Sequence, residues 1–541
     1  MSNDPVSCSA MVQAPPSFPE NPFTPSSRKP VSAGGRRTAT LITLVGSSAN
    51  TLLVSLQAVL LIPLYTHYIG PKLYGAWLGS GDVLVWLQAF DLGLPNLMIQ
   101  RVASAHGRGD HKTVGEWFTS TMFALAIAGC LIAVGGFLIA GHIATFLAVR
   151  DSAAAQLQMC FGIAASVTGV LIVNNGLVGF SRAVQRTGLT NVVTIVAGIA
   201  GLLVSLWSIL HGSGLLAIPL GMVVRAIVTL FGSAWFSISF LNSTYHPHLR
   251  VRMLVLREML LVSPATAFGT LGYAVMNQSD TVLAASLFGP EMALVLNLTK
   301  KSADVFRSLI DMIGFASYGG FAHLVSSPER NKALIIHSDI TSLRLFAVIL
   351  AAAAYMCANQ TLVTKWVGSN YYGGPLLTVI VGLHLIIVGG SYLTNYLYRA
   401  AGQIVNGSLM LIAESLLRIP LMVMFSHWFQ LPGLLVGGIV TAAASMTLVQ
   451  RWTNKQLAPF AQPATGGSPR VWAVRAAVFA TGALECAFIP TGCLALTVTA
   501  GILTVSFGGA ALVYTDTSLS RVLAISVRLL PIFGRRPLDA S

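Results

Sequence analysis

The chain has 541 residues, of which 54% are hydrophobic and only 9% are charged, and its mean hydropathy is +0.73. A soluble globular domain carries about 25% charged residues, so this composition excludes a soluble protein and indicates a polytopic membrane protein. The net charge of +14 would suggest a nucleic-acid partner in a soluble chain, but the basic residues gather on one side of the predicted spans and indicate topology instead.

The first 39 residues are rich in Pro and Ser and contain no apolar segment of the kind found in signal peptides. They predict a disordered cytoplasmic tail. Apolar runs of about 20 residues, enough to cross about 30 Å of hydrocarbon, then recur along the chain. Fourteen spans are predicted, at 41–66, 74–98, 115–142, 155–180, 188–210, 214–240, 259–287, 291–320, 338–358, 373–398, 404–427, 430–450, 471–490 and 492–514.

These runs predict an all-α fold, a polytopic transmembrane helical bundle with both termini in the cytoplasm. With the N-terminus placed there, only Lys72, Arg150 and Lys365 fall on the opposite side of the membrane, as expected from the asymmetry of Lys and Arg in loops. The predicted domains are a tail (1–39), a six-span half (40–256), a second six-span half (257–453), a linker (454–470), two extra spans (471–515) and a C-terminal tail (516–541).

The predicted span 74–98 carries two carboxylates, Asp82 and Asp91. Nine residues along a straight helix turn the side chain by about 180°. We therefore expect at most one of the two to face a given cavity.

A metal site is not predicted. The six cysteines show no CxxC spacing, and His246 and His248 lie in a basic loop without a neighbouring Cys or acid. A solvated loop is the simpler interpretation of the two histidines, and no disulfide is indicated.

The two halves repeat a sequence pattern. Gly70-Pro71 begins a tight turn between two apolar helices, and Gly289-Pro290 does the same 219 residues later. Further pairs share this order along the two halves, namely Asp110 with Glu329 and Arg182-Ala183 with Arg399-Ala400. Two six-span halves of like orientation are therefore predicted, with the substrate near the midplane between them. Chance similarity among apolar helices is the alternative.

The predicted span 291–320 is unusual because it carries a row of charges. Four of them, Lys300, Asp304, Arg307 and Asp311, fall within about 60° of one helix face. A charge at bilayer depth costs roughly 2.5 to 3.5 kcal/mol, so such residues pair or line a water-filled cavity. We expect a cavity, because Lys301 has no obvious partner. The alternative is a set of ion pairs that neutralise one another and only stabilise the helix bundle.

Short motifs run through both halves in a set order. The first half contains Ile62-Pro63-Leu64, Gly70-Pro71, Tyr74-Gly75, Asp91-Leu92-Gly93-Leu94 and the stretch from Arg101 to Asp110, and the second begins with Asn277-Gln278-Ser279-Asp280 and Gly289-Pro290. Over residues 40–450 this order resembles the polysaccharide-transporter family, which includes the Wzx-type O-antigen flippases of the multidrug/oligosaccharidyl-lipid/polysaccharide (MOP) exporter superfamily. The chain is also similar to the MviN/MurJ-type lipid II flippases.

The resemblance implies a V-shaped carrier of two helical bundles. Its implied cargo is the undecaprenyl-diphosphate-linked oligosaccharide repeat unit, moved from the inner to the outer leaflet of the bacterial inner membrane for O-antigen, capsule or exopolysaccharide synthesis. A polysaccharide polymerase and a chain-length regulator would be partners, together with membrane lipids. In the lipid II flippases the last two of fourteen spans line a lipid groove, and the two extra spans here look like that arrangement.

A lipid diphosphate carries at least two negative charges, which Lys or Arg side chains in a wet chamber would offset. The candidates are Arg307, Lys300, Arg225, Lys301 and Arg418. Arg418 follows Glu414 by one helical turn, so a self-paired structural role explains it equally well. Arg344 lies near a predicted cytoplasmic end, where its long side chain is expected to snorkel to the interface.

The sequence contains no GxxxxGK[ST] phosphate-binding loop, so we expect a proton or sodium gradient to supply the energy, with no cofactor. Carboxylates held partly buried within spans can titrate or bind a cation. The coupling candidates are Asp280, Asp304, Asp82 and Asp311, and the alternative for each is a role as an ion-pair partner only.

Three other functions compete with a flippase. A cation-coupled drug or metabolite antiporter of the MATE type would favour an acidic and aromatic chamber, whereas bases outnumber acids in these spans. A membrane glycosyltransferase or ligase would need a large outer loop, and no predicted outer loop exceeds about fifteen residues, so an enzyme is not expected. A scaffold for polysaccharide assembly is the third.

Overall fold

The computed structural model describes residues 46–521 of the chain, apart from short gaps at 47–48, 51–52, 55, 58, 148, 151, 185, 245–249, 327–329, 458–468, 489–493 and 517. Within these described ranges the chain is helical and contains no strand. The predicted N-terminal tail, most of the linker and nearly all of the C-terminal tail lie outside the described residues, as do Cys8, Cys493, His246, His248 and Glu329.

Thirteen long helices account for most of the described chain. They are α2 (Pro71–Gln88), α3 (Leu94–Arg108), α4 (His111–Phe146), α5 (Ser152–Ala183), α6 (Gly188–Leu210), α7 (Ala217–Thr244), α8 (Met253–Phe288), α9 (Pro290–Ser326), α10 (Ala333–Trp366), α11 (Gly374–Ala400), α12 (Ile404–Leu457), α13 (Pro469–Phe488) and α14 (Leu494–Thr515). In the part of the chain that the structure describes, nine helices are long and apolar enough to cross a membrane. The protein is therefore a multi-pass membrane protein with an all-α fold. The count of fourteen spans stays a prediction, because the first span is described as a continuous helix only over Val59–Tyr68.

Two predicted spans are interrupted, and a third helix, α12, contains the turn between two predicted spans. The predicted span 74–98 is two helices, because α2 ends at Gln88 and Leu92 and Gly93 adopt left-handed backbone angles (φ 55° and 69°) before α3. Gln278 has non-helical angles inside α8, and Gln430 has φ 53° inside α12. At Gln430 the chain reverses direction, because Gly433, Gly437 and Gly438 lie against Phe425, Met422 and Arg418. The boundary predicted between the spans 404–427 and 430–450 is therefore confirmed, and α12 consists of two antiparallel helices. Such interruptions free backbone groups from the helical ladder.

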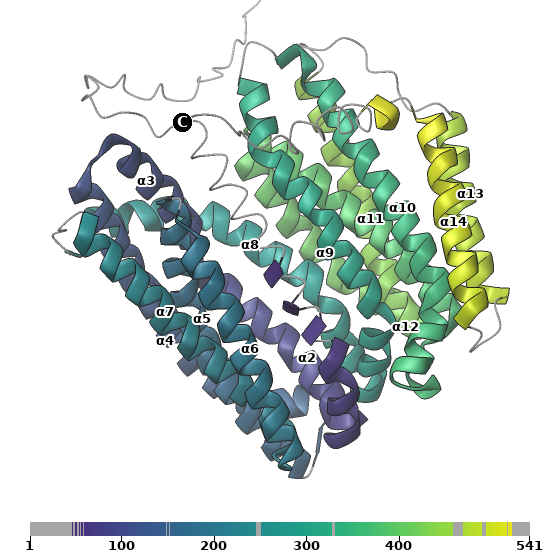
Figure 1. The fold of residues 1–541 in the computed structure, drawn as a ribbon, viewed down its shortest axis with the longest axis horizontal. Helices are drawn as coiled ribbons and strands as arrows, with labels where there is room; N and C mark the ends of the chain where they lie inside the picture. Colours follow the sequence, from purple (N-terminus) through teal and green to yellow (C-terminus); the bar gives the residue numbers. More distant parts are fainter. Residues whose placement is uncertain are drawn as a thin grey trace, which may run out of the picture.

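The helices form two groups that diverge as a V (Figure 1). Helices α3–α7 make one arm and α9–α14 the other, while α2 and α8 lie between the arms in Figure 1. The two arms draw together at the end that carries the Gly70-Pro71 and Gly289-Pro290 turns, here called the Gly-Pro end. They separate at the opposite end, which carries the loop between α3 and α4 and is here called the basic end.

The turns at the Gly-Pro end have matching backbone geometry in the two halves. Gly70 has φ 87° and ψ 153°, and Gly289 has φ 91° and ψ 163°, angles that favour glycine. A proline then opens each following helix. At this end α2 and α9 cross so closely that a Cβ on Gly75 would lie 1.9 Å from the carbonyl oxygen of Pro290.

Helix α8 joins the two arms. Near its beginning, Glu258 pairs with Arg101 of α3, and just before it Arg252 Nη1 lies 2.8 Å from Glu116 Oε2 of α4. Its far end belongs to the other arm, where Asp280 is paired with Lys300 of α9 at 3.0 Å. Each end of α8 is therefore fixed to a different arm of the V.

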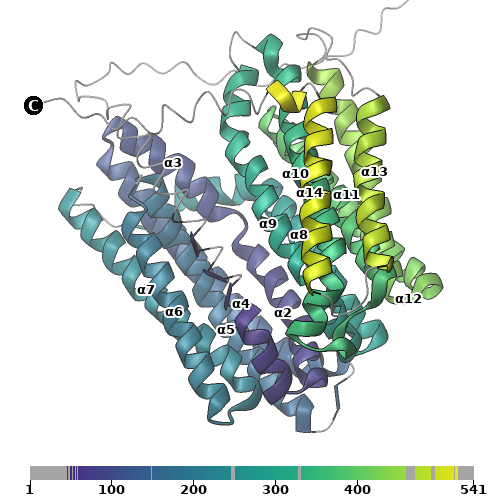
Figure 2. The same cartoon turned by 45° about the vertical axis from the view of Figure 1, so that its right-hand side comes forward.

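The last two helices pack on the outside of the second arm, against α10 (Figure 2). A buried ion pair of 2.7 Å between Arg475 and Asp516 holds α13 to the end of α14. Cys357 and Thr361 of α10 contact Thr497 of α14. These helices are thus an addition to the outer face and do not reach the space between the arms.

Candidate functional site

A cavity of about 890 Å³ lies between the two arms. Its walls come from α2 and α5 on one side and from α8 and α9 on the other. The charged residues that line it are Asp82, Asp91, Lys300, Lys301, Asp304, Arg307 and Asp311. The four charges that helical periodicity places on one face of α9, Lys300, Asp304, Arg307 and Asp311, therefore face one polar cavity, and Lys301 lines it too. The remaining polar lining is rich in amides, namely Gln88, Asn175, Asn277, Gln278 and Asn297.

Both Asp82 and Asp91 line this cavity, so the expectation that at most one of them faces it is wrong. That expectation assumed a straight helix. Because α2 stops at Gln88 and a short 3₁₀ turn carries Ala89–Asp91, the backbone changes direction before Asp91. The Asp91 side chain then accepts a hydrogen bond of 2.8 Å from the backbone N–H of Gly93, which stabilises the turn.

Behind the cavity wall, Asp280 is the centre of a buried charged cluster. Its Oδ2 atom lies 3.0 Å from Lys300 Nζ and 3.9 Å from His384 Nε2, and its Oδ1 atom lies 3.7 Å from Arg418 Nη2. Arg418 also contacts His384 Nε2 at 3.0 Å. The cluster joins α8, α9, α11 and α12, and Asp280 and Arg418 are 1% and 0% exposed.

Two of the predicted binding residues, Arg418 and Lys300, belong to this cluster. Arg418 is buried in it and is not among the residues that line the cavity. Its ionic partner is Asp280, not Glu414, whose Oε2 atom instead accepts a hydrogen bond from Ser391. Lys300 lines the cavity, but its ammonium is bonded to Asp280.

Arg307 is held on the cavity wall by three neighbours. Its Nε lies 3.6 Å from Asp311 Oδ2, one turn along α9, and its Nη2 donates to the side-chain oxygen of Asn277. The guanidinium lies over the ring of Tyr392, 5.0 Å from its centroid. Asn277 in turn donates to the Tyr392 hydroxyl, so the orientation of the guanidinium is fixed from both sides.

Lys301 and Asp304 line the cavity without an ion pair to any residue in the described ranges. Asp82 has a buried Oδ2 atom that makes no hydrogen bond within the described structure. These three groups are the charges of the cavity most open to a ligand or ion. At the cavity surface four carboxylates face three bases, so the expected excess of bases is not found there.

Arg225 lies apart from this cavity. Arg225 is on α7 and packs against α6, where a Cβ added to Gly201 would lie 3.1 Å from the Cβ of Arg225. The cavity lining draws on α2, α5, α8 and α9 and not on α7. The structure thus separates Arg225 from the other binding candidates.

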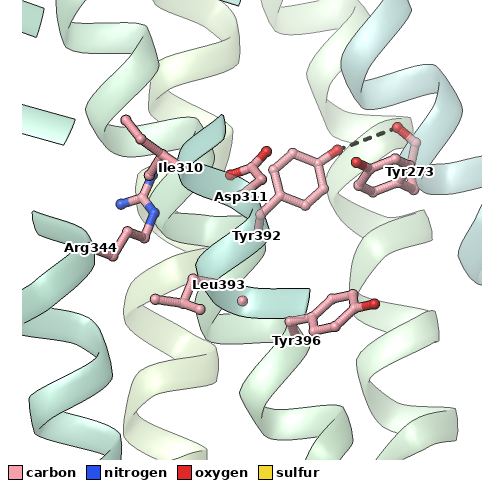
Figure 3. Close-up of a pocket in the computed structure, with 8 residues that line it drawn as sticks. Tyr273, Ile310, Asp311, Arg344, Tyr392, Leu393 and Tyr396 are labelled. Carbon is pink, nitrogen blue, oxygen red and sulfur yellow. Dashed lines mark hydrogen bonds between the residues drawn. The ribbon is translucent and has the colours of Figure 1, made fainter. Parts of the chain in front are cut away.

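Arg344 does not snorkel to an interface, because its side chain points into the second arm and the residue is only 3% exposed. It lines a small rear cavity of about 30 Å³ together with Asp311, Tyr273 and Tyr392 (Figure 3). The prediction was wrong because residue 344 lies twelve residues into α10, well inside the helical arm.

Several residues of the site were missed in the sequence, chiefly His384, Tyr392 and Tyr273. A histidine in the middle of the apolar run 373–398 is a polar residue at membrane depth, which is itself an indication of function. The tyrosines carry no comparable indication, because an isolated Tyr in a span is common at helix contacts.

A second large cavity, of about 710 Å³, lies between α10 and α14. Its lining is mostly apolar and includes the small residues Ala354, Ala358 and Gly501, with Lys365 and Trp366 toward the Gly-Pro end. Since α14, one of the two extra helices, forms one wall, this groove exists only because that helix is present.

Comparisons with known proteins agree with this fold. A family model described as "Polysaccharide biosynthesis protein" matches residues 42–318, about half of the chain. No curated protein matches the chain in sequence.

Among solved structures, the lipid II flippase MurJ in an inward closed conformation is 11% identical, with a TM-score of 0.63 over 88% of this chain and 99% of that chain. An inward-facing MATE family multidrug transporter of the MOP superfamily is 13% identical, with a TM-score of 0.61 over 75% of this chain and 95% of that one. A MOP superfamily transporter from Pyrococcus furiosus is 12% identical, with a TM-score of 0.55 over 76% of this chain and 96% of that chain. The chain belongs to the polysaccharide biosynthesis protein family and has the fold of MOP superfamily transporters.

Proposed function

We propose that the protein is a flippase that moves undecaprenyl-diphosphate-linked oligosaccharide repeat units from the inner to the outer leaflet of a bacterial inner membrane. The observation that carries this proposal is the composition of the cavity between the arms. It combines three cations on one wall with five amides and the aromatic residues Trp77 and Tyr273. Cations suit a diphosphate, and amides with aromatic faces suit sugar hydroxyls and rings.

Within this proposal the three cations differ in their availability. Lys300 is bonded to Asp280, and Arg307 lies near Asp311, so part of each charge is already offset. Lys301 faces the same cavity without an ion pair among the described residues. We therefore place Lys301 first as the contact to the diphosphate, with Arg307 beside it.

The carboxylates of the cavity support coupling to an ion gradient. Asp280 is surrounded by three basic groups, which leaves little room for a transported cation. Asp82, with an unbonded oxygen, and Asp304, without an ion pair, face the cavity instead. A proton or sodium ion taken up there would neutralise negative charge at the wall that meets the anionic cargo.

The apolar groove between α10 and α14 supports a role for the extra helices in holding the prenyl chain. A polyprenyl tail is too long and too apolar for the polar central cavity. The groove offers about 710 Å³ of apolar space on the outer face of the second arm, with Lys365 near the Gly-Pro end. A polymerase and a chain-length regulator remain proposed partners.

One observation favours a second function, a cation-coupled antiporter for drugs or metabolites. Four carboxylates and two aromatic residues line the cavity, and a cationic, planar substrate would match that surface. The fold of MATE transporters fits this function equally well.

Reconstituted protein separates the two functions. Proteoliposomes without ATP, with an imposed proton or sodium gradient, should flip a labelled undecaprenyl-diphosphate oligosaccharide. Lys301→Gln should slow flipping by about tenfold, roughly the effect of one charge contact, while Lys72→Gln, on the exposed Gly-Pro end of α2, should not change it. Gradient-driven movement of a cationic dye without movement of the lipid would instead favour the antiporter.

A further inference from the structure

Asp311 lines both the large central cavity and the small rear cavity. Its two carboxylate oxygens face different partners. Oδ2 lies 3.6 Å from Arg307 Nε on the central side. Oδ1 is on the side of Gly389 of α11. A Cβ added to Gly389 would lie 3.8 Å from Asp311 Oδ1 and 2.2 Å from Arg344 Nη2. One carboxylate therefore lies between two guanidinium groups, as Figure 3 shows for its rear side.

The Arg344 guanidinium occupies space that is free only because residue 389 is glycine. Any side chain at Gly389 would collide with its guanidinium. The hydrogen bonds that Arg344 makes are long, 3.4 to 3.5 Å to the carbonyl oxygens of Leu385 and Ile386, and its Nε makes none in the described structure. Its charge is thus weakly satisfied by the backbone. Asp311 lines the same rear cavity and is its acidic neighbour there, without a direct ion pair in the described structure.

The three side chains carry two positive charges and one negative charge. If Arg344 were absent, Asp311 would be free to form a full (i, i+4) pair with Arg307 on the same face of α9. In the structure Asp311 pairs with Arg307 at 3.6 Å, while Arg344 lies on its other side and shares its charge. Arg307 also bonds to Asn277 and lies over the ring of Tyr392, so Asp311 is not its only neighbour.

We infer that Arg344 is a positioning residue that offsets part of the Asp311 charge from the rear side and thereby leaves more of the positive charge of Arg307 available to a diphosphate in the central cavity. Arg344 itself does not touch the central cavity, because it is absent from the residues that line it. The inference rests on the proposed function, since it explains why Asp311 does not fully offset the charge of Arg307 in that site.

Binding of inorganic pyrophosphate to the purified full chain tests this inference, with affinity measured by calorimetry at constant salt. Arg344→Gln should weaken binding about tenfold, because the negative charge of Asp311 then acts on Arg307 alone. Asp311→Asn should bind at least as tightly as the wild type. The double variant Arg344→Gln, Asp311→Asn should recover to within about threefold of the wild type. Such a rescue would not follow if Arg344 only filled space.

Arg344→Lys keeps the charge and should bind as the wild type does, and Lys72→Gln is the control for surface charge. Gly389→Ala leaves Arg344 in the chain but pushes its guanidinium out of place. It should therefore weaken binding as Arg344→Gln does. Thermal unfolding of each variant identifies any that do not fold. Unchanged binding by Arg344→Gln and Gly389→Ala, or a double variant as weak as Arg344→Gln, overturns the inference.

Failure of the inference and failure of the proposed function give different results. If wild-type pyrophosphate binding is absent or does not depend on Arg307, the inference is wrong even where the liposomes flip the lipid. If pyrophosphate binding follows the expected order but no lipid-linked oligosaccharide moves, the inference stands and the flippase proposal is wrong.

Discussion

The carboxylate of Asp280 lies among three basic side chains that come from three other helices. We predict that Asp280→Asn strongly destabilises the protein, because it leaves the charges of Lys300 and Arg418 buried without a counter-ion, a change that costs about 3 to 5 kcal/mol. The measurements are abundance in the membrane and the thermal unfolding temperature. Asp304→Asn, one turn beyond Lys300 on α9, is the control and should unfold near the wild-type temperature. Equal stability of the two variants would show that the cluster does not hold the helices together.

The same residues show how far the site could be predicted. The charged face of α9 follows from spacing alone, because residues three and four apart share one side of a helix. The partners of that face do not, because Asp280, His384 and Arg418 come from helices that are distant in sequence. Sequence alone favours a pair of Arg418 with Glu414, because the two are one helical turn apart. Local spacing favours that pair, and only the packing of α12 against α8 replaces it with Asp280.

The crossing of α2 and α9 at the Gly-Pro end depends on one glycine. A methyl group at Gly75 would lie 1.9 Å from the Pro290 carbonyl oxygen, whereas one at Gly81, on the same helix, would meet nothing within 4 Å. We predict that Gly75→Ala lowers the unfolding temperature because it forces the arms apart. Gly81→Ala should leave it unchanged or raise it, since alanine favours a helix interior by roughly 0.5 to 1 kcal/mol. If Gly75→Ala is as stable as Gly81→Ala, the close crossing does not stabilise this state.

Helix positions were predictable, but helix interruptions were not. Apolar runs give the spans because only helices satisfy their backbone in lipid. The break at Leu92 and Gly93 does leave a trace, because Asp91, Gly93 and Pro95 interrupt the run 74–98, but the apolar residues on both sides still favour a single span. Gln278 of α8 likewise lies in a short polar stretch, 277–280, inside an otherwise apolar run. Both errors matter for function, because each interruption places polar residues on the central cavity.

The orientation of the whole molecule follows from its basic residues. We predict that a reporter fused after Ala540 lies in the cytoplasm, while one inserted between Gly368 and Gly374 lies on the opposite side. The two positions are separated by an odd number of spans in the fourteen-span prediction. Reporter activity in whole cells is the measurement, and signals from the same side would exclude that topology. In the predicted orientation the basic end, where the arms diverge, faces the cytoplasm (Figure 1).

Helix α8 has a consequence for any motion of the V. Its beginning is fixed to α3 and α4 through Glu258 and Arg252, and its far end is fixed to α9 through Asp280. The arms therefore cannot change their angle as two independent bodies, because one continuous helix would have to bend between its anchors. The backbone is already irregular at Gln278, which is where such bending costs least. Gln278 lines the cavity, and its neighbours Asn277 and Asp280 hold Arg307 and Lys300. In the proposed flippase, a bend at Gln278 would therefore shift Arg307 and Lys300 at the same time as it changes the angle between the arms.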